Sequence, residues 1–186
     1  MRGIERVRLH ADLTILAKLS CALSRAGCCR RGVTIARYCE AMSQQNVELV
    51  QAVVTLYESP EGIALLASGD LDLSAVDPDI EWDASQLADM IPDLAEVYRG
   101  HDGVRTYWRR WLDAWKGLEF KVEGLRDAGD DVALLVRDQR QTGRHSGIVT
   151  ALPPYAMVFT VRSGKLVRWR TFPNQESALK AVGLEE

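Results

Sequence analysis

The second half of the chain is a run of consecutive β-strands, and this run constrains the fold more than any other feature. The expected strands are separated by Gly-Asp and Ser-Gly turn residues, and they cover residues 118–129, 131–143, 146–161 and 165–172. Strands that follow one another through short turns pair antiparallel with their neighbours. We therefore expect an antiparallel meander.

Helices are expected before and after this meander in the sequence. In residues 101–116, the apolar side chains recur at intervals of three and four, and the charged side chains occupy the other side. This pattern predicts a helix with one buried flank that ends at Gly117. Two helices are expected upstream, one capped by Ser43 and one through "IALLAS", and Asn174 is expected to cap the last helix. The order predicts an α+β fold.

The composition changes near residue 42, and we place the domain at residues 42–186. Residues 1–41 contain 8 Lys or Arg and 3 Asp or Glu, whereas residues 42–186 contain 15 and 23. Three interpretations of residues 1–41 stay open: an extension upstream of a true start at Met42, a targeting peptide, or a short helix that docks on the domain. We favour the extension, either disordered or a start-site artefact.

Charge and composition argue against several function classes. Acidic side chains outnumber basic ones in the domain, so we expect no nucleic-acid partner. Lys18 interrupts the best apolar run, so we expect no membrane span. The four cysteines all precede residue 42, and a domain without cysteine suits a cytoplasmic location. Their spacing is not that of zinc ligands, so we expect no metal. The chain has none of the common nucleophile, zinc or nucleotide motifs, and we expect no cofactor.

The segment "VDPDIEWDAS", at residues 76–85, alternates acidic and apolar residues. Asp79, Glu81 and Asp83 have one parity, and Ile80 and Trp82 have the other. Because strand side chains point alternately to opposite faces, either an acidic site or an aromatic wall faces the interior.

The elements, taken in order, resemble the SnoaL-like polyketide cyclases of the nuclear transport factor 2-like superfamily, which also contains ketosteroid isomerase and limonene epoxide hydrolase. The resemblance rests on "SGDLD" (68–72), "DPDIEW" (77–82), "YRGHDGVRTYW" (98–108), "DAGDDVALLVR" (127–137), "SGK" (163–165) and "SALKAVGL" (177–184). It implies a cone-shaped, cystatin-like fold, in which a strongly curved mixed or antiparallel sheet has helices packed on its concave face. It also implies a deep apolar pocket and a homodimer formed through the outer face of the sheet.

The resemblance allows a test for isomerase chemistry. Ketosteroid isomerase uses a carboxylate base together with an oxyanion hole made by a tyrosine and a protonated aspartic acid. By position, the base falls on Trp82, the oxyanion acid on Met157 and the tyrosine near Gly62. The sequence therefore fills none of the three roles.

This result favours the aromatic wall in the segment at residues 76–85. A strand residue one position beyond the base points to the opposite face unless a bulge intervenes, which places Asp83 at the rim. We expect Ile80 and Trp82 to face the pocket and Asp79 and Glu81 to face water. Trp82 is either core or a ligand-stacking wall, and both roles are compatible.

The resemblance also implies which residues line the pocket. Arg137 and Asp138 are adjacent in a strand, so only one of them is expected to reach the hollow, where an arginine would bind a carboxylate or enolate. The expected ligand-binding residues are Trp82, Tyr98, Trp108, Arg137, Tyr155, Met157 and Trp169. Such a lining suits a small apolar or aromatic molecule.

Our leading hypothesis is therefore a cofactor-free SnoaL-like protein that binds such a molecule. If it is an isomerase, cyclase or hydratase, Asp83 or His101 would handle the proton. His101 begins the helix at residues 101–116, where the helix dipole would disfavour a charged imidazole. The alternative is a non-enzymatic ligand-binding or dimerisation module of the same fold.

Overall fold

A curved, mixed β-sheet is the central element of the structure, a computed structural model that describes residues 35–68 and 71–184. The strands are β1 (Val76–Asp83), β2 (Val97–Arg99), β3 (Trp115–Ala128), β4 (Asp131–Gly143), β5 (Val149–Leu152), β6 (Tyr155–Arg162) and β7 (Lys165–Phe172). The strand order is β2-β1-β7-β6-β4-β3, and β5 pairs with β4. The properties expected for residues 1–34 lie outside the described residues.

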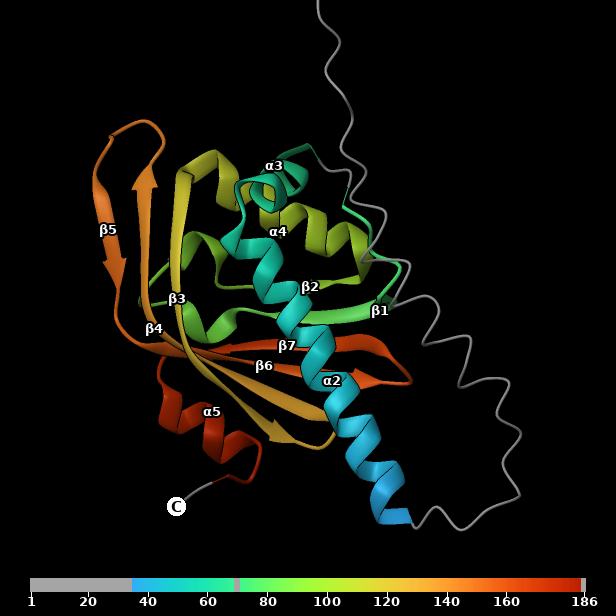
Figure 1. The fold of residues 1–186 in the computed structure, drawn as a ribbon. Helices are drawn as coiled ribbons and strands as arrows, with labels where there is room; N and C mark the ends of the chain where they lie inside the picture. Colours follow the sequence, from blue (N-terminus) through green and yellow to red (C-terminus); the bar gives the residue numbers. More distant parts are fainter. Residues whose placement is uncertain (1–34, 69–70, 185–186) are drawn as a thin grey trace, which may run out of the picture. The chain divides into compact units, whose positions relative to one another are not determined.

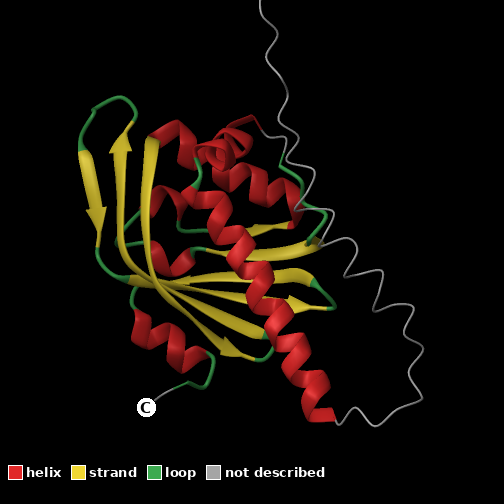
Figure 2. Ribbon diagram, in the orientation of Figure 1, coloured by secondary structure: helices red, strands yellow, loops and turns green. Residues whose placement is uncertain are grey.

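The helices lie on both faces of this sheet. They are α2 (Ile35–Glu58), α3 (Pro60–Ser68), α4 (Gly100–Ala114) and α5 (Gln175–Ala181), with 3-10 turns at η1 (Ser85–Leu87) and η2 (Pro92–Leu94). Figure 1 shows α2, α3 and α4 on the side toward which the sheet curls, whereas α5 lies on the other side. Figure 2 shows the same layers by type of secondary structure. None of the described helices is long and apolar enough to span a membrane.

The pairing confirms the expected fold class. β3, β4, β6 and β7 form consecutive antiparallel pairs in the order β3-β4-β6-β7. β1 then pairs in parallel with β7, so the sheet is mixed and the earliest strand lies beside the last. This return brings the "DPDIEW" segment against the C-terminal strand.

One predicted strand is two strands in the structure. The segment at residues 146–161 is interrupted at Pro153 and Pro154, which separate β5 from β6. Proline has no backbone N–H to donate to a neighbouring strand, so pairing stops there. β5 pairs with β4 at residues 139–142, and β6 pairs with β4 at residues 131–136.

Two predicted helix ends are wrong and one is confirmed. α4 ends at Ala114, and Gly117 has φ +71° at a register shift inside β3, where glycine accommodates a bulge. Ser43 lies within α2, which begins at Ile35, so Ser43 does not cap it. Asn174 does cap α5, because its side chain accepts a hydrogen bond of 2.8 Å from the Ser177 backbone N–H.

The two faces of the sheet bury separate hydrophobic cores. Ile80 and Trp82 are buried in the concave core, as predicted for β1. On β6, Tyr155, Met157, Phe159 and Val161 also belong to the concave core, as alternation along a strand requires. The convex core is smaller and packs against α5; it contains Ala133, Leu135, Ala156, Val158, Phe172 and Ala178.

Candidate functional site

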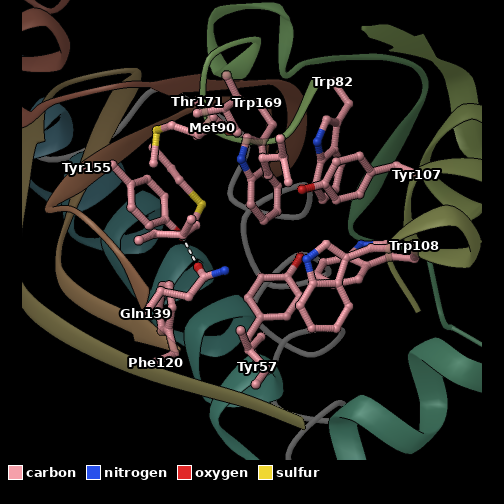
Figure 3. A pocket seen from close by; sticks show the side chains of 16 residues that line it. Tyr57, Trp82, Met90, Tyr107, Trp108, Phe120, Gln139, Tyr155, Trp169 and Thr171 are labelled. Atoms are coloured by element: carbon pink, nitrogen blue, oxygen red, sulfur yellow. Dashed lines mark hydrogen bonds between the residues drawn. The ribbon is translucent and has the colours of Figure 1, made fainter. Parts of the chain in front are cut away.

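The concave face encloses a small cavity whose lining is mainly aromatic and aliphatic (Figure 3). The space open to the centres of water-sized molecules is about 40 Å³. A single water needs roughly 10–15 Å³ on this measure, so the cavity has room for about three waters. The lining residues are Tyr57, Trp82, Leu87, Met90, Ile91, Tyr107, Trp108, Trp111, Leu118, Phe120, Gln139, Leu152, Tyr155, Met157, Trp169 and Thr171.

The wall of the cavity is built on a stacked pair of indole rings. Trp82 and Trp169 are direct neighbours in the parallel register of β1 and β7, and both side chains project to the concave face. Their ring centroids are 3.9 Å apart and their planes differ by 19°, which is a stacked geometry. Neighbouring strands therefore fix the position of both rings.

Helices α2 and α4 complete this wall with further aromatic rings. The Tyr107 ring centroid lies 4.7 Å from that of Trp82, and Trp108 meets Trp82 edge-on at 5.9 Å. Tyr57 lies 5.0 Å from Trp108 and 5.6 Å from Trp169. Contacts of this kind stabilise aromatic pairs beyond the area they bury, so the wall is a connected and ordered surface.

Two indole N–H groups of lining residues, those of Trp82 and Trp169, are buried and have no hydrogen-bond acceptor among the described residues. Buried tryptophan N–H groups usually find a partner, and an unmade hydrogen bond in the interior is costly. The described chain therefore leaves these two donors unpaired.

A chain of hydrogen bonds occupies the opposite side of the cavity in Figure 3. The Tyr155 hydroxyl donates to Gln139 Oε1, and Gln139 Nε2 donates to Gln141 Oε1 over 2.9 Å. Gln139 and Gln141 are both buried, and Gln141 Nε2 has no acceptor among the described residues. The polar groups of β4 and β6 thus largely satisfy one another.

The tyrosines of the cavity keep their protons. Burial raises the pKa of Tyr57, Tyr107 and Tyr155 well above the ordinary value, and the neighbouring tyrosines raise it further. For Tyr57 alone, a hydrogen bond donated by the Trp108 side chain acts in the opposite direction and lowers the pKa. All three hydroxyls are therefore neutral, and each has a proton to donate.

The lining offers no acid–base pair and no metal ligands. None of the described residues that line the cavity is Asp, Glu, His, Lys or Arg. Nor does any part of the described chain bring together three His, Cys, Asp or Glu side chains in a group suited to a metal ion. What the cavity can do chemically is to bind an uncharged molecule and donate hydrogen bonds to it.

The two candidate catalytic residues lie outside this lining. Asp83 is half buried, and its Oδ1 accepts hydrogen bonds from the Ser85 backbone N–H at 3.0 Å and the Ser85 hydroxyl at 2.6 Å. His101 Nε2 lies 3.1 Å from the Val76 carbonyl oxygen, a contact that ties the start of α4 to β1. Both side chains therefore have local structural contacts, and their proposed role in proton transfer stays a prediction.

The predicted ligand-binding residues separate into three groups. Those that line the cavity are Trp82, Trp108, Tyr155, Met157 and Trp169. Tyr98 is buried outside the lining, and its hydroxyl lies 3.3 Å from the Leu94 carbonyl oxygen, to which it donates. Arg137 is exposed.

A bulge explains why neither Arg137 nor Asp138 reaches the cavity. Lys121 pairs with Asp138, but the next residue of β3 pairs with Val136, so Arg137 is an extra residue in β4. The bulge shifts the alternation of side chains, and Val136 and Gln139 both face the concave core although they are three residues apart. The expectation that one of the adjacent pair points inward is therefore wrong.

The sequence reasoning missed several lining residues. Tyr57 and Tyr107 lie on periodic apolar helix faces, which predict burial but do not distinguish a cavity wall from solid core. Met90 and Ile91 lie between β1 and β2, and their apolar character was the available signal. Gln139 had no signal, because its inward position depends on the bulge in β4.

Trp108 is also part of a second, larger hollow. A cleft of about 500 Å³ lies between α3 and α4, and its lining includes Leu66, Leu71, Arg105, Arg109, Leu112 and Arg144 together with Trp108. The Trp108 side chain therefore forms a wall of both the inner cavity and the outer cleft.

Comparison with protein families gives one match. The model of the SnoaL-like domain matches residues 62–169, which is more than half of the chain. This match confirms the resemblance inferred from the sequence. No curated protein matches the chain.

Solved structures show the fold. TerC co-crystallised with polyporic acid matches with a TM-score of 0.53 and 18% identity, over 75% of this chain and 98% of TerC. An NTF2-like protein of unknown function from Burkholderia pseudomallei matches with a TM-score of 0.53 and 18% identity, over 74% and 97%. A protein from Catenulispora acidiphila with a ketosteroid isomerase-like fold, in complex with trimethylamine, matches with a TM-score of 0.52 and 14% identity, over 74% and 94%.

The raised tyrosine pKa values predict that the folded chain loses stability in alkaline solution. Below about pH 10, these tyrosines are protonated in both the folded and the unfolded chain. Above that pH, the unfolded chain releases protons that the folded chain keeps. The free energy of unfolding should then fall by up to about 1.4 kcal/mol per pH unit for each of Tyr57, Tyr107 and Tyr155.

Urea unfolding measured from neutral to alkaline pH tests this prediction, with ultraviolet absorbance of tyrosinate as a second signal. The Tyr107→Phe variant should show a shallower decline than the parent chain. Tyrosinate absorbance from all tyrosines in a chain that is still folded would contradict it.

Proposed function

We infer that this chain, which belongs to the SnoaL-like domain family, binds an uncharged, largely apolar aromatic molecule in the cavity of its concave face. The observation that carries this proposal is the lining itself: a connected wall of aromatic rings with unused indole donors and without an ionised side chain among its members. A ring-shaped ligand would pack against this wall with offset or edge-on geometry.

The electrostatics of the lining favour a neutral ligand. Moving an ion from water into apolar surroundings is costly unless an opposite charge accompanies it. The described residues of the lining offer no such charge, and the three tyrosines stay protonated. An aromatic molecule without formal charge avoids this cost.

The size of the cavity implies that side chains move when a ligand binds. About 40 Å³ is open to water-sized centres, whereas a cavity that binds benzene in an engineered protein measures about 150 Å³. Trp108 lies between this cavity and the outer cleft of about 500 Å³. Rotation of the Trp108 ring toward the cleft would enlarge the cavity on that side.

Solved structures of similar folds contain small organic molecules. TerC was co-crystallised with polyporic acid, and the protein from Catenulispora acidiphila is in complex with trimethylamine. The sequence identities of 18% and 14% carry the fold alone, so the ligand class proposed for this chain rests on its own lining.

A cofactor-free isomerase, cyclase or hydratase is the second candidate. The donors favour it, because indole N–H and neutral tyrosine hydroxyl groups stabilise the negative charge that develops on an enolate oxygen. Such a reaction also needs a base, and Asp83 and His101 lie outside the lining. The non-enzymatic binding module is therefore the better supported candidate.

Binding can be tested with uncharged one-ring aromatic compounds and thermal unfolding. A ligand that binds only the folded chain should raise its stability by about 2.7 kcal/mol at a hundred times the dissociation constant. Leu118 lines the cavity from β3, so Leu118→Trp should fill it and reduce the rise. Val122 lies on the same strand and packs against the core outside the lining, so Val122→Trp is the matched control.

The expected pattern is a concentration-dependent rise in the parent chain and the Val122→Trp variant and a smaller one in Leu118→Trp. If no compound of the panel stabilises the parent chain, the cavity is not a binding site for this class. If the compounds stabilise both variants equally, they bind at a site other than this cavity.

We also propose that the chain forms a homodimer through the convex face of the sheet. α5 covers the part of this face around Ala156 and Phe172. On the same sheet, Glu81 forms ion pairs with Arg99 and Arg168, and the N–O distance is 2.7 Å in each pair. Arg168 and Arg170 are half buried on this face, and acidic side chains of a second copy would pair with the exposed parts of their guanidinium groups.

Light scattering coupled to size-exclusion chromatography measures the mass in solution, which should be twice that of one chain. Arg170→Glu should shift the population to monomer. Arg162→Glu, at the exposed last residue of β6, should not. A monomer at every concentration of the parent chain would refute the homodimer.

A further inference from the structure

We propose that the outer cleft between α3 and α4 is a second binding site, and that it takes an amphipathic carboxylate, a molecule with one anionic head on an apolar body. This site is separate from the concave-face cavity, although Trp108 borders both. The cleft measures about 500 Å³, which lies within the usual range for small-molecule sites, roughly 300–1,000 Å³. The two helices that frame it lie next to each other in Figure 1.

The floor of the cleft is apolar. Leu66 of α3 and Leu112 of α4 contribute buried side chains, and the Trp108 ring lies between the cleft and the inner cavity. Leu71, between α3 and β1, is half buried and adds a further apolar group. An apolar body that covers these side chains removes hydrocarbon surface from water, which is favourable. The floor therefore fits an alkyl chain or a ring.

The rim of the cleft is cationic. Arg105 and Arg109 come from α4, and Arg144 comes from the turn between β4 and β5. Asp113 is the one carboxylate among the described residues that line the cleft, so three positive charges face one negative charge and the net charge is +2. The described lining of the inner cavity, by contrast, has no formal charge. The cleft therefore attracts an anion that the cavity would exclude.

Arg109 has a guanidinium group that the described chain leaves unpaired. It is exposed, and it forms neither a hydrogen bond nor an ion pair with the described residues. Arg105 lies one turn before it, and the distance from Arg105 Nη1 to Oδ1 of the exposed Asp102 is 3.0 Å. Like charges four residues apart destabilise a helix, so an anion between the two arginines would remove a repulsion. One free guanidinium matches the two oxygens of one carboxylate.

The other polar groups of the cleft orient the ligand. Arg144 is already occupied, because its Nε donates to the Leu112 carbonyl oxygen at 2.6 Å and its Nη2 donates to the Trp115 carbonyl oxygen at 3.3 Å. Asp113 and the last carbonyl groups of α4 lie at the same end of the helix, where they repel an anion. The carboxylate head is therefore expected nearer the middle of α4, beside Arg109.

The test measures by isothermal titration calorimetry how four compounds bind the full chain: octanoate, octanamide, octylammonium and acetate. Octanoate and octanamide have nearly the same size and shape, and they differ in charge. Octanoate should bind about 5-fold more tightly than octanamide, the upper end for one exposed ion pair, and added sodium chloride should reduce this ratio. Acetate lacks the apolar body and octylammonium has the opposite charge, so both should bind more weakly than octanoate.

Variants then locate the site. Arg109→Gln removes the charge at an exposed position, so the ratio of octanoate to octanamide affinity should fall toward one. Arg110→Gln is the matched control, because it removes the same charge from the next residue of the helix, which pairs with Glu96 outside the lining of the cleft. The ratio should survive there. Leu118→Trp, which fills the inner cavity, should leave octanoate binding unchanged.

The outcomes keep this inference apart from the proposed function. Equal affinity for octanoate and octanamide, equal affinity for octanoate and acetate, or no binding of octanoate would overturn the cleft site and leave the proposed function of the cavity as it stands. A ratio that survives Arg109→Gln, or that falls equally in both arginine variants, would also overturn it. Loss of octanoate binding in Leu118→Trp would do the same, because it would place the ligand in the cavity.

Discussion

The stacking of Trp82 on Trp169 is the contact around which the concave side is organised. It exists because β1 returns to pair in parallel with β7, which sets the two tryptophans directly beside each other. Strand alternation then sends both rings to the concave face and leaves Glu81 with its arginines on the other side. The rings of α4 pack against this stack, so the helix and the sheet meet through aromatic contacts.

The polar groups of this interior are arranged unevenly. The amides and the hydroxyl on β4 and β6 hydrogen-bond to one another, whereas the indoles of Trp82 on β1 and Trp169 on β7 do not find acceptors in the described chain. Native interiors rarely leave several buried donors unpaired, and such groups therefore point to a function. Because burial also keeps Tyr57, Tyr107 and Tyr155 neutral, the cavity is polar without being charged. Those properties suit the binding of an uncharged molecule better than transfer of a proton.

Much of this fold could be predicted from the sequence, because the relevant signals are local. Alternation divided the residues of β1 into two faces, the family resemblance indicated which face is buried, and the order of elements predicted the α+β class. What failed depends on contacts between distant segments. The bulge at Arg137 comes from pairing with β3, and it moves Gln139 into the cavity against simple alternation. Gly117 was expected to end a helix, but the chain enters β3 two residues earlier.

The account requires that the aromatic wall built on Trp82 and Trp169 borders a binding space. A crystal structure of the protein purified from its native source, at a resolution that shows ordered ligands, measures this most directly. We predict planar density in the cavity, packed against the rings of this wall. A cavity closed by its own side chains, with no density beyond them, would contradict the account.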